Sequence, residues 1–145
     1  MSSTEFTVHT SLSPREVLAV ITDFGPDRAR WWPNVDDAHF TVHDQGPDWA
    51  EVTEGTSMGW ERERYSWDAA AGTVTIDTLE SNLWGPGSSW HYELVPAGDG
   101  TDLRVALQRK PISFRGKLVA GLIPLVGART LGKQFESVLR RAEHR

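Results

Sequence analysis

Four side chains in this sequence have the chemistry for acid–base catalysis in a protein interior. Such a reaction needs a base that removes a proton and a partner that stabilises an oxyanion, each within hydrogen-bond reach of the substrate. A phenol, a guanidinium, an imidazole and a carboxylate can fill these roles, and the candidates are Tyr92, Arg109, His43 and Glu80. The sequence alone brings no two of them together.

The phase of the last expected strand bears on Arg109. This residue alternates in step with Leu103, Val105 and Leu107, so its side chain begins on the core side of the strand. An inward Arg could anchor a ligand carboxylate or phosphate. We favour the alternative, in which the side chain reaches past the strand end to water.

A second run of charges lies on the strand expected over residues 58–67. Glu61 and Glu63 alternate there with Arg62 and Arg64, so one pair faces inward unless the strand is bulged. Inward charges are tolerated in a hydrated cavity and are costly in a packed core. The sequence leaves the choice of pair open, and the face shared with Trp60 favours Arg62 and Arg64.

Aromatic residues supply the other candidate binding surface. The chain has seven Trp, five Phe and two Tyr. Trp90 and Tyr92 share one strand face, and Trp84 lies in the loop that leads to it. These rings either form a ligand-binding wall with polar handles or pack as ordinary core, and both readings stay open. Trp31 and Trp32 are expected to brace a helical insert.

Metal and hydrolase sites are not predicted. His39 and His43 are four residues apart, which on a strand separates them by about 13 Å, too far to share an ion. The chain has no Cys, and the Gly-x-Ser-x-Gly nucleophile elbow is absent. We expect neither a metal nor a cofactor.

The elements that must position these residues are mostly strands. Alternating patterns joined by short turns predict seven antiparallel strands, over residues 5–12, 39–44, 49–54, 58–67, 73–81, 88–95 and 101–110. After the first strand, Ser13-Pro14-Arg15-Glu16 has the pattern of a helix start, with Ser13 as N-cap. A second short helix over residues 26–32 completes a V-shaped insert.

The last third of the chain predicts a long helix in two parts. Each part has an apolar stripe at helical spacing, namely Leu118, Val119, Leu122 and Val126, then Leu131, Phe135, Val138 and Ala142. The two stripes are out of phase by about 140°. Because Pro124 lies at the joint, we expect a kink or a break there.

Size and charge limit the function classes. A chain of 145 residues with ordinary hydrophobic content predicts one domain. Residues 109–145 carry a net charge of +7 and residues 1–108 a net charge of −12. We favour a solvated basic helix face, expect no nucleic-acid partner, and retain weak contact with a membrane surface as an alternative. No signal peptide or membrane-spanning run is evident, so a cytoplasmic location is expected.

This order of elements resembles the helix-grip fold of the superfamily of START lipid-transfer domains and the birch-pollen allergen. The resemblance covers the whole chain, residues 1–145, and its local carriers are Ser13-Pro14-Arg15-Glu16-Val17, Trp31-Trp32-Pro33, Gly100-Thr101 and the basic terminal helix. The chain is most similar to the polyketide cyclase/dehydrase and lipid-transport branch. The resemblance implies an α+β fold whose curved seven-stranded sheet wraps a long kinked C-terminal helix.

A curved sheet and a straight helix leave a space between them unless large side chains fill it. The expected wall is Trp60, Trp84, Trp90, Tyr92, Val105, Leu107, Arg109, Leu118, Leu122 and Val126. Three hypotheses follow: binding of a lipid, polyketide or quinone-like molecule, cyclase or dehydratase catalysis, or membrane or partner docking through residues 118–126. A cavity without acids and bases favours the first, neighbouring titratable groups the second, and an apolar patch around Leu122 and Ile123 the third.

Overall fold

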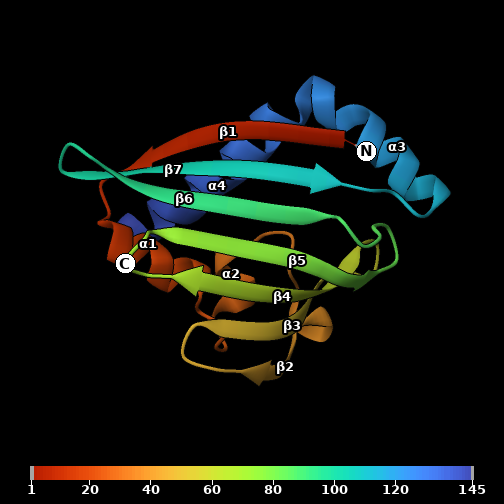
Figure 1. Cartoon of the computed structure of the whole chain (residues 1–145), viewed down its shortest axis with the longest axis horizontal. Helices are drawn as coiled ribbons and strands as arrows, with labels where there is room; N and C mark the ends of the chain where they lie inside the picture. Colours follow the sequence, from red (N-terminus) through yellow and green to blue (C-terminus); the bar gives the residue numbers. More distant parts are fainter. Residues whose placement is uncertain (1, 145) are drawn as a thin grey trace.

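The computed structural model describes residues 2–144, and Met1 and Arg145 of the expected domain lie outside the described residues. Seven antiparallel strands form one sheet in the order β1-β7-β6-β5-β4-β3-β2 (Figure 1). The predicted number and arrangement of strands are confirmed. Their bounds are β1 Ser2–Thr10, β2 Thr41–Gln45, β3 Trp49–Gly55, β4 Trp60–Asp68, β5 Thr73–Ser81, β6 Ser89–Ala97 and β7 Gly100–Arg109.

Two irregularities in strand pairing interrupt the regular ladder of the sheet. Pairing of β4 with β5 shifts between Arg62 and Glu63, and pairing of β2 with β3 shifts between Val42 and Asp44. A bulge of this kind bends its strand and increases the local twist. The sheet therefore curves around the helical elements on its inner side (Figure 1).

The helical insert begins with the predicted capping box. Helix α1 (Pro14–Ile21) follows Ser13, whose Oγ accepts a hydrogen bond from the Glu16 backbone N–H at 3.2 Å. In return, the Glu16 carboxylate accepts from the Ser13 N–H at 3.0 Å. The short helix α2 (Arg28–Trp31) and the 3-10 helix η1 (Asp37–His39) complete the connection to β2.

The terminal helix is interrupted at Pro124, as predicted. Helix α3 (Phe114–Leu122) leads into a π-helical turn, η2 (Ile123–Gly127), and then into α4 (Ala128–Glu143). Proline has no N–H to donate to the carbonyl one helical turn earlier. That carbonyl, on Ala120, accepts a hydrogen bond from the Ser2 hydroxyl at 2.7 Å, which joins α3 to the first strand.

The two apolar stripes of the terminal helix have different surroundings. On α4, Phe135, Val138 and Ala142 are buried against the sheet, with Leu139 beside them. The α3 stripe does not face the sheet in this way, since Leu118 is 58% exposed. The side of α3 that contacts the protein body carries Gly116 and Ala120 instead, because only small residues fit there. A Cβ on Gly116 would lie 2.4 Å from the Leu83 carbonyl oxygen.

Candidate functional site

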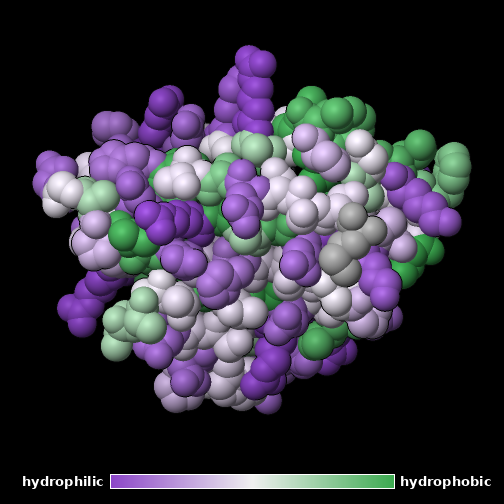
Figure 2. Space-filling view, turned by 45° about the horizontal axis from the view of Figure 1, so that its top comes forward, coloured by the Kyte–Doolittle hydropathy of each residue, from purple (hydrophilic) through white to green (hydrophobic). Residues whose placement is uncertain are grey.

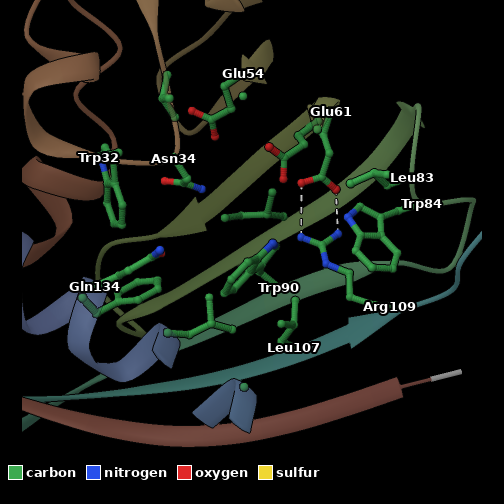
Figure 3. Close-up of a pocket in the computed structure, with 18 of the residues that line it drawn as sticks. Trp32, Asn34, Glu54, Glu61, Leu83, Trp84, Trp90, Leu107, Arg109 and Gln134 are labelled. Atoms are coloured by element: carbon green, nitrogen blue, oxygen red, sulfur yellow. Dashed lines mark hydrogen bonds and ion pairs between the residues drawn. The ribbon is translucent and has the colours of Figure 1, made fainter. Parts of the chain in front are cut away.

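A cavity of about 470 Å³ lies between the inner face of the sheet and the helical elements (Figure 3). Its floor is formed by inward side chains of β4 to β7, and its cover by η2, the first turns of α4, and the insert around α2. The hollow exists because the bent sheet and the interrupted terminal helix do not meet along their whole length. Indole and phenyl rings therefore line this space without filling it.

The structure brings seven of the ten expected wall residues to the cavity. They come from the loop before β6, from β6 and β7, and from the end of α3 and the π-helical turn, and they are Trp84, Trp90, Tyr92, Leu107, Arg109, Leu122 and Val126. Figure 3 shows Trp84 and Trp90 on either side of the Arg109 side chain. Whether these residues bind a ligand remains a prediction.

Three expected wall residues lie elsewhere. The Trp60 side chain lies on the outer face of β4, whereas Glu63 and Tyr65 lie buried on its inner face. Val105 faces inward but belongs to the packed core beyond the cavity, where it is 2% exposed. Leu118 points to solvent because the small side of α3 packs against the body.

Two of the four candidate catalytic residues are also outside the cavity. His43 is exposed on the edge strand β2, where its Nε2 is 2.7 Å from the Thr53 hydroxyl. Glu80 is exposed beside the bulge of β5. The alternation of inward and outward side chains along a strand does not place His43 or Glu80, because the strand pairing shifts by one residue next to each of them. Tyr92 and Arg109 do line the cavity together.

The inward pair of charges on β4 consists of the carboxylates, contrary to the expectation for Arg62 and Arg64. Glu61 and Glu63 line the cavity, and Glu63 is 3% exposed. Arg62 instead pairs with Glu51 at 2.9 Å, away from the cavity. The deciding signal was present in the sequence, because Tyr65 has the same phase as the two glutamates and prefers the interior.

Arg109 is buried, contrary to our preference for an outward side chain, and its charge is matched within the cavity. Its two terminal nitrogens donate to the two carboxylate oxygens of Glu61, at 2.6 and 3.2 Å. The guanidinium also lies 5.3 Å from the Trp84 ring centre and 5.2 Å from that of Trp90. Thr78 donates to Glu61 at 2.9 Å, which fixes the carboxylate from a third direction.

A second buried ion pair, not anticipated from the sequence, lies at the opposite side of the cavity. The Arg28 Nε donates to Glu54 at 3.0 Å, and Nη2 donates to Glu54 and to the Tyr65 hydroxyl, at 3.3 and 2.8 Å. Nη1 donates to the carbonyls of Ile21 and Asp23. All five N–H groups of Arg28 therefore have acceptors, and Tyr65 in turn donates to Glu54.

The surroundings of Glu54 and Glu63 shift the pKa values of these two buried carboxyl groups in opposite directions. Burial pushes the pKa of Glu54 upward, but the Arg28 guanidinium outweighs it and holds this pKa below its ordinary value. Burial raises the pKa of Glu63 well above its ordinary value, and the charges of Glu61 and Glu54 raise it further. These opposite shifts favour the ionised form of Glu54 and the protonated form of Glu63 beside it.

Replacing Glu63 by Gln is expected to change how stability depends on pH. A raised pKa in the folded state contributes stability that is complete below the ordinary value of 4.5 and is lost as the pH rises through the folded pKa. Wild type should therefore lose stability relative to Glu63→Gln on going from acid to neutral pH, by at most about 1.4 kcal/mol per pH unit. Glu54 contributes in the opposite direction, but it is present in both proteins.

Urea denaturation at several pH values measures this difference. Glu80→Gln, the same change at an exposed carboxylate, serves as the control and should follow wild type. A stability difference between Glu63→Gln and wild type that does not vary with pH would contradict the assignment of the retained proton.

Two polar groups near the cavity have no hydrogen-bond partner within residues 2–144. Tyr92 lines the cavity, yet its hydroxyl makes no hydrogen bond, and burial raises the pKa of this phenol so that it stays protonated. Trp32 also lines the cavity, although we expected it only to brace the insert, and its Nε1 is buried without an acceptor. Figure 3 places Asn34 and Gln134 on the same side as Trp32.

A curved antiparallel sheet around a long terminal helix, with a mixed polar and apolar interior, is the helix-grip fold. Residues 1–143 match the family model described as "Polyketide cyclase / dehydrase and lipid transport", and the chain belongs to this family. A search of curated proteins found no match to the chain.

Solved structures with the same fold share little sequence with this chain. A START superfamily protein from Mycobacterium smegmatis is 16% identical, with a TM-score of 0.77 and 99% of each chain covered. The Zhui aromatase/cyclase from a Streptomyces species is 16% identical, with a TM-score of 0.76, covering 99% of this chain and 94% of that one. Norcoclaurine synthase from Thalictrum flavum, with dopamine and hydroxybenzaldehyde, is 11% identical, with a TM-score of 0.69 and coverage of 99% and 87%.

Across the part of the chain that the structure describes, no helix is both long and apolar enough to cross a membrane.

Proposed function

We propose that the protein binds an uncharged, hydrophobic small molecule that carries a hydrogen-bond acceptor, such as a lipid, polyketide or quinone-like compound. The observation that carries this proposal is a cavity in which each cation already has its own carboxylate. The family description and the ligands named for the plant synthase agree with a small-molecule partner.

The size and walls of the cavity support an apolar guest. Its volume of about 470 Å³ is within the range of small-molecule sites. Trp84, Trp90 and Leu107 present flat or branched apolar surface on one side, and Leu122 and Val126 on the other. Burying such surface against a ligand is favourable in proportion to the area removed from water.

The charge balance supports an uncharged guest. Among the described residues that line the cavity, the cations are Arg28 and Arg109, and both are in ion pairs with less than a tenth of the Arg side chain exposed. With Glu63 protonated, the carboxylates of Glu54 and Glu61 balance them. A ligand carboxylate or phosphate would have to displace one of these partners, and breaking a buried pair is costly.

The polar groups in the interior support a ligand with an acceptor. The Tyr92 hydroxyl has no hydrogen-bond partner in the described chain, and the Trp32 Nε1–H, which also lines the cavity, is buried without an acceptor. A carbonyl or hydroxyl oxygen of the ligand would satisfy these donors. The ligand would then enter with its polar end first and leave its apolar part between the tryptophans.

A pair of fluorescent probes that differ in one charge tests the proposal. Phenylnaphthylamine is neutral, and anilinonaphthalene sulfonate is the same ring system with an anionic group. Wild type should bind the neutral probe more tightly. Glu61→Gln leaves the Arg109 charge without its carboxylate, so the affinity for the sulfonate should rise roughly tenfold or more.

Controls separate charge from general damage to the fold. Glu80→Gln makes the same substitution at an exposed site and should leave both affinities unchanged. Circular dichroism checks that Glu61→Gln is folded. Tighter binding of the sulfonate by wild type would overturn the claim that the ligand is uncharged. Native mass spectrometry of freshly purified protein would then identify the class of any bound molecule.

A second candidate function is a cyclisation or dehydration that uses the same cavity. The observation that favours it is the proximity of Glu54, Tyr65 and the protonated Glu63. Two carboxyl groups with opposite protonation states are suited to acid–base catalysis. In this case Glu63 would protonate a carbonyl or a departing hydroxyl of the substrate.

Mass spectrometry distinguishes a carrier from a catalyst. A catalyst would convert an added polyketone to a product that has lost water, and Glu63→Gln would abolish this conversion while retaining binding. A carrier would return the polyketone unchanged with either protein.

A further inference from the structure

We propose that the surface formed by α3 and the π-helical turn docks the protein on an anionic membrane. The docking patch is the set of exposed apolar residues on these two elements, which are Phe114, Leu118, Val119, Leu122, Leu125 and Val126. Figure 2 shows hydrophobic residues gathered over this end of the molecule, with hydrophilic side chains beside them. The proposal does not require that the cavity be occupied.

The exposure of these side chains is unusual for a protein surface. Phe114 and Leu125 are each 78% exposed, and Leu118 and Leu122 are 58% and 56% exposed. Scattered single apolar residues are common on surfaces, whereas a contiguous group indicates an interaction site. Since α3 contacts the body through Gly116 and Ala120, packing within the chain does not cover the remaining apolar faces.

The charged residues of the segment that carries the docking patch all have one sign. No Asp or Glu occurs between Asp102 and Glu136, although the whole chain has a net charge of −5. The exposed cations in this interval that lie on or next to the two elements are Lys110, Arg115, Lys117, Arg129 and Lys133. Apolar side chains bordered by Lys and Arg are the composition of helices that lie in the interface of anionic bilayers.

The same charges disfavour pairing of two copies of the chain through this surface. A two-fold interface brings a patch against its own copy, so Arg115 and Lys117 would approach their equivalents. Like charges at short range oppose association. An anionic lipid surface instead satisfies the apolar and the cationic groups together.

The position of the patch relates docking to the cavity. Val119, Leu122 and Val126 are exposed and also line the cavity, so its mouth opens within the patch. Docking would set this opening against the lipid. This consequence, unlike the docking itself, rests on the proposed function, because only a ligand-binding cavity makes use of it.

Sedimentation with vesicles tests the docking. Full-length protein should sediment with vesicles of phosphatidylcholine and phosphatidylserine, and far less with phosphatidylcholine alone. Binding should weaken as salt is added, because salt screens the attraction between Lys or Arg and lipid. Failure of wild type to sediment with the anionic vesicles at low salt overturns the proposal.

Matched variants identify the surface that binds. Leu118→Ser and Leu125→Ser alter exposed side chains, so the fold should survive and vesicle affinity should fall roughly tenfold. Arg115→Glu should weaken binding at least about fivefold. Arg140→Glu makes the same charge reversal at an exposed site near the end of α4 and should change binding much less.

Two further measurements separate the alternatives. Equal losses from Arg115→Glu and Arg140→Glu would show a general charge effect and overturn the assignment to this patch. A dimer in sedimentation velocity that Leu118→Ser dissociates would identify the patch as a contact between copies, which also overturns it. Binding of phenylnaphthylamine by the same variants reports on the cavity separately, so docking and ligand binding can fail independently.

Discussion

Replacing Arg28 by Met is expected to lower the free energy of unfolding by about 3–5 kcal/mol. The side chain is 2% exposed, and its N–H groups reach Glu54, Tyr65 and two backbone carbonyls. Methionine has similar length but no donor, so the Glu54 carboxylate would stay buried without its cation. Urea denaturation followed by circular dichroism measures the loss.

A double variant and an exposed pair provide the comparison for Arg28→Met. Adding Glu54→Gln removes the stranded carboxylate and should restore part of the stability, since a buried pair replaced by neutral groups costs less than a broken one. Arg62→Met, at an ion pair whose Arg side chain is 39% exposed, should cost no more than about 1 kcal/mol. Equal losses from the two Arg variants would contradict the role given to the buried pair.

Replacing Phe135 by Ala is expected to cost about 3–5 kcal/mol of unfolding free energy and to enlarge the cavity. The ring is 4% exposed, and its centre lies 5.2 Å from Trp32, 5.4 Å from Phe6, 5.6 Å from Tyr92 and 6.0 Å from Trp90. Removing it deletes aromatic contacts to β1, to the end of α2 and to β6. Thermal and urea denaturation measure the cost.

Phe114→Ala makes the same substitution at a residue that is 78% exposed. It should change stability by less than about 0.5 kcal/mol, because the phenyl group packs against little of the folded protein. Phe135→Ala should also accept bulkier neutral probes than wild type does. A Phe135→Ala protein as stable as Phe114→Ala would show that this ring does not hold α4 against the sheet.

The strands, the start of α1 and the break in the terminal helix could be predicted from local sequence patterns that have few alternative interpretations. Strand alternation and short turns predicted the antiparallel run from β2 to β7, and the capping box at Ser13 and Glu16 predicted the start of α1, whereas the pairing of β1 with β7 did not follow from them. Pro124, between two out-of-phase stripes, located the break in the terminal helix. Each signal depends on neighbours within one or two turns, which is why the sequence alone was enough.

The interior charges were harder to predict, for two different reasons. Glu54 shares the inward phase of Ala50 and Val52 on β3, so a careful count would have placed its carboxylate inside. Arg28 could not be placed, because a helix of four residues has no periodicity to indicate a buried side. Its partner is 26 residues away, and only the folded arrangement brings the two together.

The π-helical turn divides the terminal helix into a part that packs on the sheet and a part that is mostly exposed. Residues beyond it, on α4, hold the sheet together through Phe135 and Val138, whereas those before it contribute little burial. Substitutions at the exposed positions of α3 should therefore cost little stability. The same segment thus combines a buried helix that packs on the sheet with a helix whose apolar side chains stay exposed, and Pro124 lies between the two.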